Sequence, residues 1–498
     1  MADDPAEPPG LDVELAASDD VRAVAGYRVA LQPTRSQVRR SAPAAGKSYD
    51  SNYGGDDNGG SDLQRSTASL SNFWNQGVAD FAPVKRPLRS GYDVVVVGAG
   101  FSGLAVASGL ARSGLSVLVL EEKTVGYGAS SRNGGMVGPS FHELGMVGLT
   151  RKYGEEKARS IMRAGIEALD YCQDLFSSEG FDCAFRMTGR FRGARSEAHL
   201  RSMIAECKRL NASVGLPYEV VEPSDLHHHT GSRAYKGGVV YPRDGGLHPK
   251  RLVNSLASRA EAAGAHIQAN TPVMGIMRDG KGFQVAIPSA VLAARHVVVA
   301  TNGYSDRRVS VMNDRVVPID VTVSATRPLG EERVRAMSPR FHMHGESGRI
   351  FIWSRPTPDH TRFIFGGRIS NPSAPVHIQQ QQIATAVRRL YPDLTAADFE
   401  QIWNGKIAYT TDHAPHLAQI DGIWLIGGYC GSGVTRSLYF ADKLVRKMTG
   451  QPGSETAFDD LGFPHVPFRI FAPFGARMLT RYYAWLDRRE FRKAGELG

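Results

Sequence analysis

YDVVVVGAGFSGLAVASGLARSGLSVLVLEE, residues 92–122, is the stretch that decides the fold of this chain. Its run of valines predicts a strand buried on both faces, the residues from Phe101 predict a helix, and SVLVL predicts a second parallel strand. Gly98, Gly100 and Gly103 form a G-x-G-x-x-G motif at the strand-to-helix turn. Such glycines let the backbone and a helix N-terminus approach a pyrophosphate, and a following acid binds ribose hydroxyls. We therefore expect a Rossmann-like dinucleotide-binding unit, with Glu121 as that acid.

The composition is that of a globular protein, with 42% hydrophobic and 22% charged residues among 498. The net charge is +9, but the lysines and arginines are scattered, so we expect no nucleic-acid binding. No apolar run is long enough to cross a bilayer, and the acidic, proline-rich start is unlike a secretion signal. The four cysteines include no C-x-x-C pair, which argues against a zinc or thioredoxin-like site and favours a reducing cytoplasm.

Downstream of this unit, the apolar periodicity predicts helices over residues 155–176, 197–214 and 249–264, and buried strands near 296–304 and 423–434. A second glycine cluster, Gly427, Gly428, Gly431 and Gly433, follows the last of these strands. The first motif alone does not distinguish FAD from NAD. A long insertion before a second glycine cluster suits a cofactor stretched across the fold, whereas an NAD dehydrogenase continues with closely spaced βα units.

Four stretches carry a resemblance to a known family. They are DVVVVGAGFSGL (93–104), GYGASSRNGGMV (126–137), VVVATNGYS (297–305), and WNGKIAYTTDHAP (403–415) followed by GGYCGSGVTRSLYFADKLV (427–445). In these the chain resembles the FAD-dependent amine and amino-acid oxidases of the D-amino-acid oxidase and sarcosine oxidase superfamily. Among them it is most similar to bacterial gamma-glutamylputrescine oxidoreductases.

The resemblance implies an α/β plus α+β fold, in which a Rossmann-like FAD-binding domain meets an antiparallel-sheet substrate domain. We assign residues 69–150, 240–305 and 396–450 to the first domain, and 151–239 and 306–395 to the second. Residues 1–68 are expected to be a disordered extension. Residues 451–498 are expected to dock on the core, with Met478, Leu479, Tyr482, Tyr483 and Leu486 on one helix face.

The implied reaction oxidises the C–N bond of a small amine or amino acid. Hydride passes to the flavin, water hydrolyses the resulting imine, and O2 reoxidises the flavin to yield H2O2. Two alternatives stay open: a dehydrogenase that uses another electron acceptor, and an inactive flavin-binding partner protein. FAD is expected to be non-covalent, because no cysteine stands near Ile407, where sarcosine oxidases attach their flavin.

The resemblance also implies cofactor contacts along the whole chain. Beside the first glycine motif and Glu121, the expected contacts are Ser102, Ser130, Ser131, Arg132, Asn133, Gly134, Val273, Thr301, Gly405, Gly431, Gly433, Val434 and Thr435. The helix that starts at Gly433 would direct its positive dipole end at the flavin. The subgroup often has histidine where this chain has Ser432, and a smaller residue where it has Cys430.

The substrate pocket is expected to include Arg132, Trp353, Arg368 and Tyr429. Trp353 and Arg355 alternate onto one strand face, but we expect Arg355 to be a surface arginine. His227–His229 is expected to be a surface loop rather than a metal site, because neighbouring side chains diverge and no acids accompany them. Asp412 and His413 are expected to play structural roles in a turn near the flavin.

Overall fold

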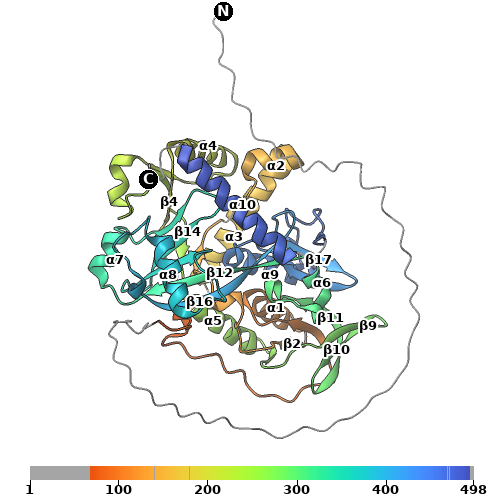
Figure 1. Cartoon of the computed structure of the whole chain (residues 1–498). Coiled ribbons are helices and arrows are strands. Elements are labelled where there is room, and N and C mark those ends of the chain that lie inside the picture. The colour runs from red at the N-terminus through yellow and green to blue at the C-terminus, as the bar shows by residue number, and fades with distance from the viewer. Residues whose placement is uncertain (1–67, 140, 179, 468, 470–471, 494–498) are drawn as a thin grey trace, which may run out of the picture. The chain divides into compact units, whose positions relative to one another are not determined.

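The computed structural model describes residues 68–139, 141–178, 180–467, 469 and 472–493. The extension expected over residues 1–68 therefore lies outside the described residues, except for Ala68. Two eight-stranded sheets organise the described part of the chain (Figure 1). This is the α/β plus α+β class that the sequence predicts.

The first sheet contains the stretch that opened the sequence analysis. Its strands, in spatial order, are β17 (His416–Ile420), β18 (Ile423–Gly427), β11 (Ala290–Val299), β1 (Gly91–Val97), β2 (Val117–Leu120) and β8 (His266–Gln268), while β10 (Gly282–Ile287) pairs with β11 and β9 (Gly275–Asp279) pairs with β10. β1 lies between two parallel neighbours, β2 and β11. Both faces of β1 are covered: Val94 and Val96 belong to the hydrophobic cluster that includes α1, and Val95 and Val97 belong to a second cluster that includes Phe283 and Met312, which explains why these valines are buried without alternation.

The second sheet is mostly antiparallel. Its order is β16 (Phe399–Tyr409), β12 (Val317–Thr326), β15 (Phe363–Gly367), β14 (Ile352–Pro356), β13 (Met343–Glu346), β4 (Arg190–Gly193), β6 (Gly238–Tyr241) and β5 (Glu219–Val221). The sequence analysis assigned residues 396–450 to the FAD-binding domain, and within that range β16 pairs into the second sheet, while β6 spans the expected boundary between residues 239 and 240. β16 pairs with β12 along nearly its whole length, so its long-range partner rather than its local pattern decides its sheet.

The helices lie around these sheets. They are α1 (Phe101–Arg112), α2 (Gly145–Tyr153), α3 (Glu155–Ser178), α4 (Glu197–Val214), α5 (Pro249–Ala262), α6 (Ser310–Asn313), α7 (Glu331–Met337), α8 (Val376–Val387), α9 (Gly433–Thr449) and α10 (Ala472–Lys493). Short 3-10 turns are η2 (Phe73–Asn75), η3 (Ala129–Ser131), η4 (Pro223–His228), η5 (Asn302–Tyr304), η6 (Arg307–Val309) and η7 (Ala396–Asp398), and β3 (Met136–Val137) pairs with β7 (Gly245–Gly246). The helices predicted over 155–176, 197–214 and 249–264 are therefore present as α3, α4 and α5.

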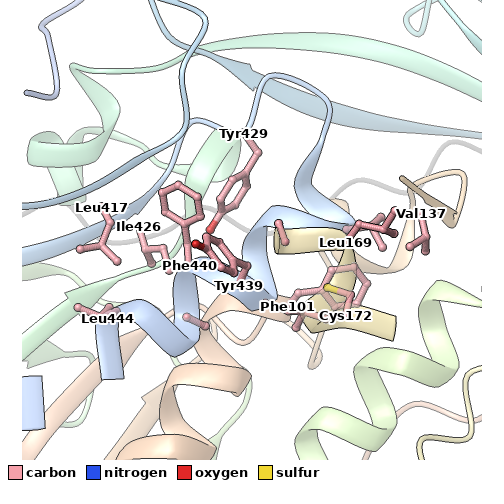
Figure 2. Close-up of a cluster of buried hydrophobic side chains, with 14 of the residues drawn as sticks. Phe101, Val137, Leu169, Cys172, Leu417, Ile426, Tyr429, Tyr439, Phe440 and Leu444 are labelled. Atoms are coloured by element: carbon pink, nitrogen blue, oxygen red, sulfur yellow. The ribbon is translucent and has the colours of Figure 1, made fainter. Parts of the chain in front are cut away.

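A hydrophobic cluster joins α1, α3 and α9 behind the first sheet. Figure 2 shows part of it, with Phe101, Cys172, Tyr429 and Phe440 among the labelled side chains. All four cysteines are free thiols, and burial raises the pKa of the Cys172 thiol far above its usual range. Cys172 is thus a core residue without thiolate chemistry.

The last helix, α10, buries part of the predicted face together with residues beyond it. Met478 and Tyr482 are about half exposed, Tyr483 and Leu486 are partly buried, and Asp487 and Phe491 are buried. Asp487 accepts hydrogen bonds from the backbone N–H groups of Arg349 and Ile350, so a buried carboxylate anchors the helix. None of the described helices has both the length and the apolar character needed to cross a lipid bilayer.

Candidate active site

A cleft of about 260 Å³ lies at the carboxyl ends of the parallel strands of the first sheet. The β1–α1 turn, the end of β2 and the segment 127–133 form one end of it. Residues 300–309, residues 406–408 of β16 and residues 429–437 form the other side. Ligands of open α/β sheets bind at this edge, so the cleft is the candidate active site.

The glycine motif leaves room that side chains would fill. Gly98 has a φ of +104°, which favours glycine, and a Cβ on Gly103 would lie 1.9 Å from the carbonyl oxygen of Gly98. A Cβ on Gly100 would lie 2.8 Å from Oγ of Ser130. That Oγ accepts a 3.0 Å hydrogen bond from the N–H of Phe101, so segment 126–138 is fastened to the start of α1.

Glu121 and Glu122 differ sharply although they are adjacent. Glu121 accepts hydrogen bonds from the N–H groups of Ala99 (2.9 Å) and Lys123 (3.0 Å), and burial raises the pKa of its carboxyl group. Glu122 instead pairs with Arg308 at 3.1 Å near the surface. Glu121 therefore joins the glycine turn to the end of β2.

The carbonyl oxygens of residues 131–135 all accept hydrogen bonds from side chains brought in from distant parts of the chain. The donors are Asn72 to residue 131, Trp403 to 132, Trp74 to 133, and Arg355 to both 134 and 135. These contacts fix the direction of five successive peptide groups. These side chains hold the stretch between the η3 turn and the short β3–β7 pair.

Arg355 was expected to be a surface residue, and the structure corrects this. Only 6% of it is exposed, and its Nη1 also donates to the carbonyl oxygen of Leu247 at 3.0 Å. Burial lowers the pKa of its guanidinium to about 10. The strand pattern could not reveal this, because the carbonyl groups that receive Arg355 come from segments far away in sequence.

Arg132 and Ser131 are turned away from the cleft. Arg132 donates from Nε to the carbonyl oxygen of Tyr127 (2.8 Å) and from Nη1 to that of Asn404 (3.3 Å), and it stacks on the Tyr127 ring. Ser131 is buried, and its Oγ has no partner among the described residues. Both residues therefore support segment 126–138 from behind.

The far end of the cleft meets the start of α9. Gly431 has a φ of +94°, and a Cβ placed on it would meet only Ile407, at 4.0 Å. Ser432 does not cap α9, because its hydroxyl donates backwards to the carbonyl oxygen of Tyr429. The first N–H groups of α9 are thus left uncapped beside the cleft, and Gly433 and Val434 line it.

Cys430 lines the cleft between these elements. It has a φ of +49°, and its thiol donates to the carbonyl oxygen of Gly428. Burial raises the pKa of this thiol, so it is a protonated, packed group. Tyr429 also lines the cleft, and its hydroxyl lies 2.6 Å from that of Ser102.

The structure brings most of the predicted site residues to one cleft. Those that line it are Gly98, Gly100, Ser102, Glu121, Ser130, Asn133, Val273, Thr301, Tyr429, Gly431, Gly433 and Val434. Those that lie outside its lining are Gly103, Ser131, Arg132, Gly134, Gly405, Thr435, Trp353 and Arg368.

Trp353 and Arg368 contact other parts of the fold. The Trp353 ring packs so closely on Gly134 and Gly366 that a Cβ on either would lie within 2.6 Å of it. Arg368 donates to Thr480 of α10. Its charge also acts on Tyr409 and Glu143, and Glu143 pairs with His413 at 2.7 Å.

Several lining residues were missed by the sequence analysis. They include Tyr127, Asn302, Tyr304, Asp306, Arg308, Lys406 and Ala408. Asn302 has a φ of +47° and accepts a hydrogen bond from the N–H of Gly428, which joins the β11 and β18 turns. The TNGY turn, residues 301–304, follows a buried strand and could have indicated that Asn302 and Tyr304 line the cleft. The sequence analysis predicted only Thr301 of this turn as a cofactor contact.

The histidine run also divides. His227 and His228 are exposed as expected, but His229 is buried and stacks on His342. Asp412 accepts hydrogen bonds from the N–H of Ala414 and from His416, which fits a structural turn.

Comparison with known proteins agrees with this geometry. Residues 93–446 match the family model "FAD dependent oxidoreductase", abbreviated DAO. The chain is 26% identical to the probable oxidoreductase OrdL of Haemophilus influenzae, over 80% of this chain and 92% of that protein. It is also 26% identical to gamma-glutamylputrescine oxidoreductase of Escherichia coli, over 80% and 93%.

A solved structure shows the same fold. The glycine oxidase of Geobacillus kaustophilus superposes with a TM-score of 0.61 at 21% identity, covering 76% of this chain and 99% of that one. The resemblance seen in the sequence is thereby confirmed. With the family model spanning more than two thirds of the chain, this protein belongs to the DAO family of FAD-dependent oxidoreductases.

Proposed function

We propose that this amine or amino-acid oxidase-type enzyme holds FAD non-covalently along the cleft and oxidises the C–N bond of a small amine or amino acid. The observation that carries the proposal is that two helix N-termini, those of α1 and α9, open onto one and the same cleft. A dinucleotide needs positive backbone dipoles at its pyrophosphate and, in a flavin, at the ring that gains negative charge.

The residues present fit FAD. The cradle at Gly98, Gly100 and Gly103 closes if any of them gains a Cβ, and Glu121 stands at the ribose end. At the ring end, Gly431 faces open space and the start of α9 is uncapped. Ile407 stands on the cleft wall, and the nearby Cys430 thiol is protonated, which supports a non-covalent cofactor.

Bound FAD would supply the hydride acceptor. The chain's own residues would orient the substrate, exclude water and stabilise negative charge. The α9 N–H groups provide that stabilisation, because their dipole costs no reorganisation. Ile407, Ala408 and the buried ring of Tyr429 give the ring end an apolar wall. An amine entering such surroundings favours its neutral form, since burial disfavours the cation.

Arg368 is our proposed anchor for a substrate carboxylate, together with Tyr409. Ile407 and Tyr409 alternate onto the same face of β16, so Tyr409 continues the wall of the cleft beyond Ile407. The charge of Arg368 acts on Tyr409, which supports Arg368 as a cation near this part of the cleft. Trp353 and Arg132 are proposed to act through segment 126–138 rather than on the substrate.

We propose O2 as the electron acceptor and a cytoplasmic location. The four free thiols support a reducing compartment. A dehydrogenase with another acceptor is the alternative activity.

Anaerobic flavin reduction tests the proposal. Purified protein is mixed with gamma-glutamylputrescine, glycine, sarcosine or L-proline, and bleaching of the flavin absorbance is followed. We expect one of these or a related amine to bleach it, and we expect air to restore the colour with formation of H2O2. Flavin that stays reduced in air would reject the oxidase, and a yellow protein inert to every amine would reject the enzyme.

A further inference from the structure

A second cleft, of about 670 Å³, lies beside the second sheet and shares no lining residue with the cofactor cleft. Five separate segments form it: Arg195 just after β4, the loop before β6, α7, the residues after α8, and the end of α10. Figure 1 labels β4, α7, α8 and α10. We call it the basic cleft.

The charges that line the basic cleft are unbalanced. Five of its lining side chains are cations and one is acidic, namely Arg195, Arg233, Lys236, Arg333 and Arg389 against Asp393. Within the described part of the chain, only Arg389 among these cations forms an ion pair, through Nη2 to Oε2 of the buried Glu346 at 2.6 Å. A concave surface lined by one sign of charge concentrates ions of the opposite sign.

Two of these arginines are held in place with donors to spare. Nη1 of Arg389 is buried and has no hydrogen-bond partner among the described residues. The Arg195 guanidinium lies 3.6 Å from the centroid of the buried Phe491 ring. Burial, and then the charge of Arg389, lower the pKa of Arg195, while the charges of Glu346 and Asp487 act in the opposite direction. Guanidinium groups with donors to spare are suited to bind an oxyanion.

The floor of the basic cleft is apolar. Met337, Leu390 and Leu394 line it, and all three are buried side chains. A purely inorganic anion would use only the charged rim. A ligand with an apolar body below a charged head would use both the rim and the floor.

We propose that the basic cleft binds a small organic phosphate ester. Its doubly negative head would lie among Arg195, Arg233 and Arg333, and its apolar body would lie on Met337 and Leu390. The two negative charges of the phosphate would neutralise part of the excess positive charge in the cleft. A guanidinium group can donate two parallel hydrogen bonds to two phosphate oxygens. The site is independent of the cofactor cleft and of the substrate oxidised there.

Calorimetric titration of the flavin-loaded protein with phenyl phosphate tests the proposal. We expect saturable binding that is tighter than that of inorganic phosphate. The double charge reversal Arg233→Glu/Arg333→Glu is expected to weaken phenyl phosphate at least about tenfold. A matched control, Arg340→Glu/Arg388→Glu, makes the same charge change at exposed arginines outside the cleft and is expected to leave the affinity unchanged.

Other outcomes overturn the proposal. Absence of saturable binding, or equal losses in the test and control variants, would do so, as would release of flavin by phenyl phosphate. A chain ended at Lys493 is titrated in parallel. If the shortened chain binds phenyl phosphate and the full-length chain does not, the basic cleft of the full-length protein is not open to the ligand, and the proposal fails. Circular dichroism and anaerobic flavin reduction, unchanged in the double variants, show that folding and the first cleft are intact.

Discussion

At the scale of single residues, absence of a side chain matters as much as presence. Gly98, Gly100 and Gly103 create the cradle by having no Cβ, and the atoms they would strike are mostly backbone or closely packed. By contrast, several glycines in the same protein face open space, for example Gly275 in β9. The room for a ligand at the β1–α1 turn therefore depends on the absence of a side chain at these three positions.

Gly103→Ala should abolish or strongly reduce flavin retention. The new Cβ would lie 1.9 Å from a backbone oxygen in the turn, so the turn itself must move. The ratio of flavin to protein absorbance after purification measures the effect. Gly275→Ala, in β9 of the first sheet and with no atom within 4 Å of the added Cβ, should retain flavin fully. Equal retention by both variants would contradict the assignment of the cradle.

Arg368→Met should raise KM for a substrate that carries a carboxylate, with a smaller effect on kcat. Loss of one charged hydrogen bond corresponds to about 1.5–3 kcal/mol, or roughly ten- to a hundredfold in KM. Steady-state kinetics with a carboxylate-bearing amine and its uncharged analogue measures the difference. Arg388→Met, at an exposed arginine, is the control. If both substrates lose affinity equally, Arg368 does not bind the carboxylate.

At the scale of elements, segment 126–138 contains only the short turn η3 and the two-residue strand β3, and side chains from elsewhere hold the stretch between them. Asn72, Trp74, Arg355 and Trp403 donate to its carbonyl oxygens from η2 and the second sheet. Arg355 is the central donor, because one nitrogen serves residues 134 and 135 together. The second sheet thus shapes the cofactor cleft of the first.

Arg355→Met should weaken flavin binding and shift the flavin spectrum without displacing any direct cofactor contact. Methionine keeps an apolar body of similar length but removes the donor to the carbonyl oxygens of Gly134 and Leu247, while Gly135 keeps its bond from the N–H of Leu247. A buried carbonyl left unpaired costs about 1–3 kcal/mol. Equilibrium dialysis of FAD and the visible absorption spectrum report the change. Arg355→Lys, which restores one charged donor, should recover part of the affinity. A spectrum identical to that of the parent would show that the segment does not need this donor.

At the scale of the whole molecule, several histidines are buried in the neutral form. Burial lowers the pKa of His142, His229 and His248 to about 4, and that of His344 to about 3. Because these folded pKa values lie below the unfolded value, their contribution to stability is present above about pH 6.5 and is lost as the pH falls towards 4. Asp244 favours the folded state at low pH instead, since burial raises its pKa to about 6. One aspartate offsets only part of the effect of the four histidines, so stability should fall as the pH is lowered.

The free energy of unfolding should therefore fall steeply between about pH 6.5 and 4, by up to roughly 3 kcal/mol for each such histidine. Urea titrations followed by circular dichroism at several pH values measure the slope. His248→Asn should reduce the pH slope of the unfolding free energy by one proton, because it removes one titrating imidazole. Asparagine can still cap α5, where His248 accepts a hydrogen bond from the N–H of Arg251, so the helix should remain capped. The exposed His227→Asn should leave the slope unchanged. A slope insensitive to His248 would contradict the argument.

The sequence predicts those parts of the fold that local pattern decides. The β1–α1–β2 unit, α3, α4 and α9 follow from apolar periodicity and glycine spacing, and so does the presence of two glycine clusters at one cleft. The sequence does not reveal which strands pair, or which side chains bond, when the partners are far apart along the chain. Arg355 looked like a surface residue because its acceptors lie in other segments, and β16 was grouped with the wrong neighbours because only its pairing with β12 assigns it.

The connectivity of the cofactor cleft has a consequence for biosynthesis. The glycine turn after β1 leaves the ribosome early, whereas β18 and the start of α9 follow only after both sheets have been translated. β1 first gains β11 beside it when about 300 residues have been made, and β11 gains β18 only near the end of synthesis. The two parts of the cleft therefore come together late, and we expect flavin to be loaded only after α9 has been translated.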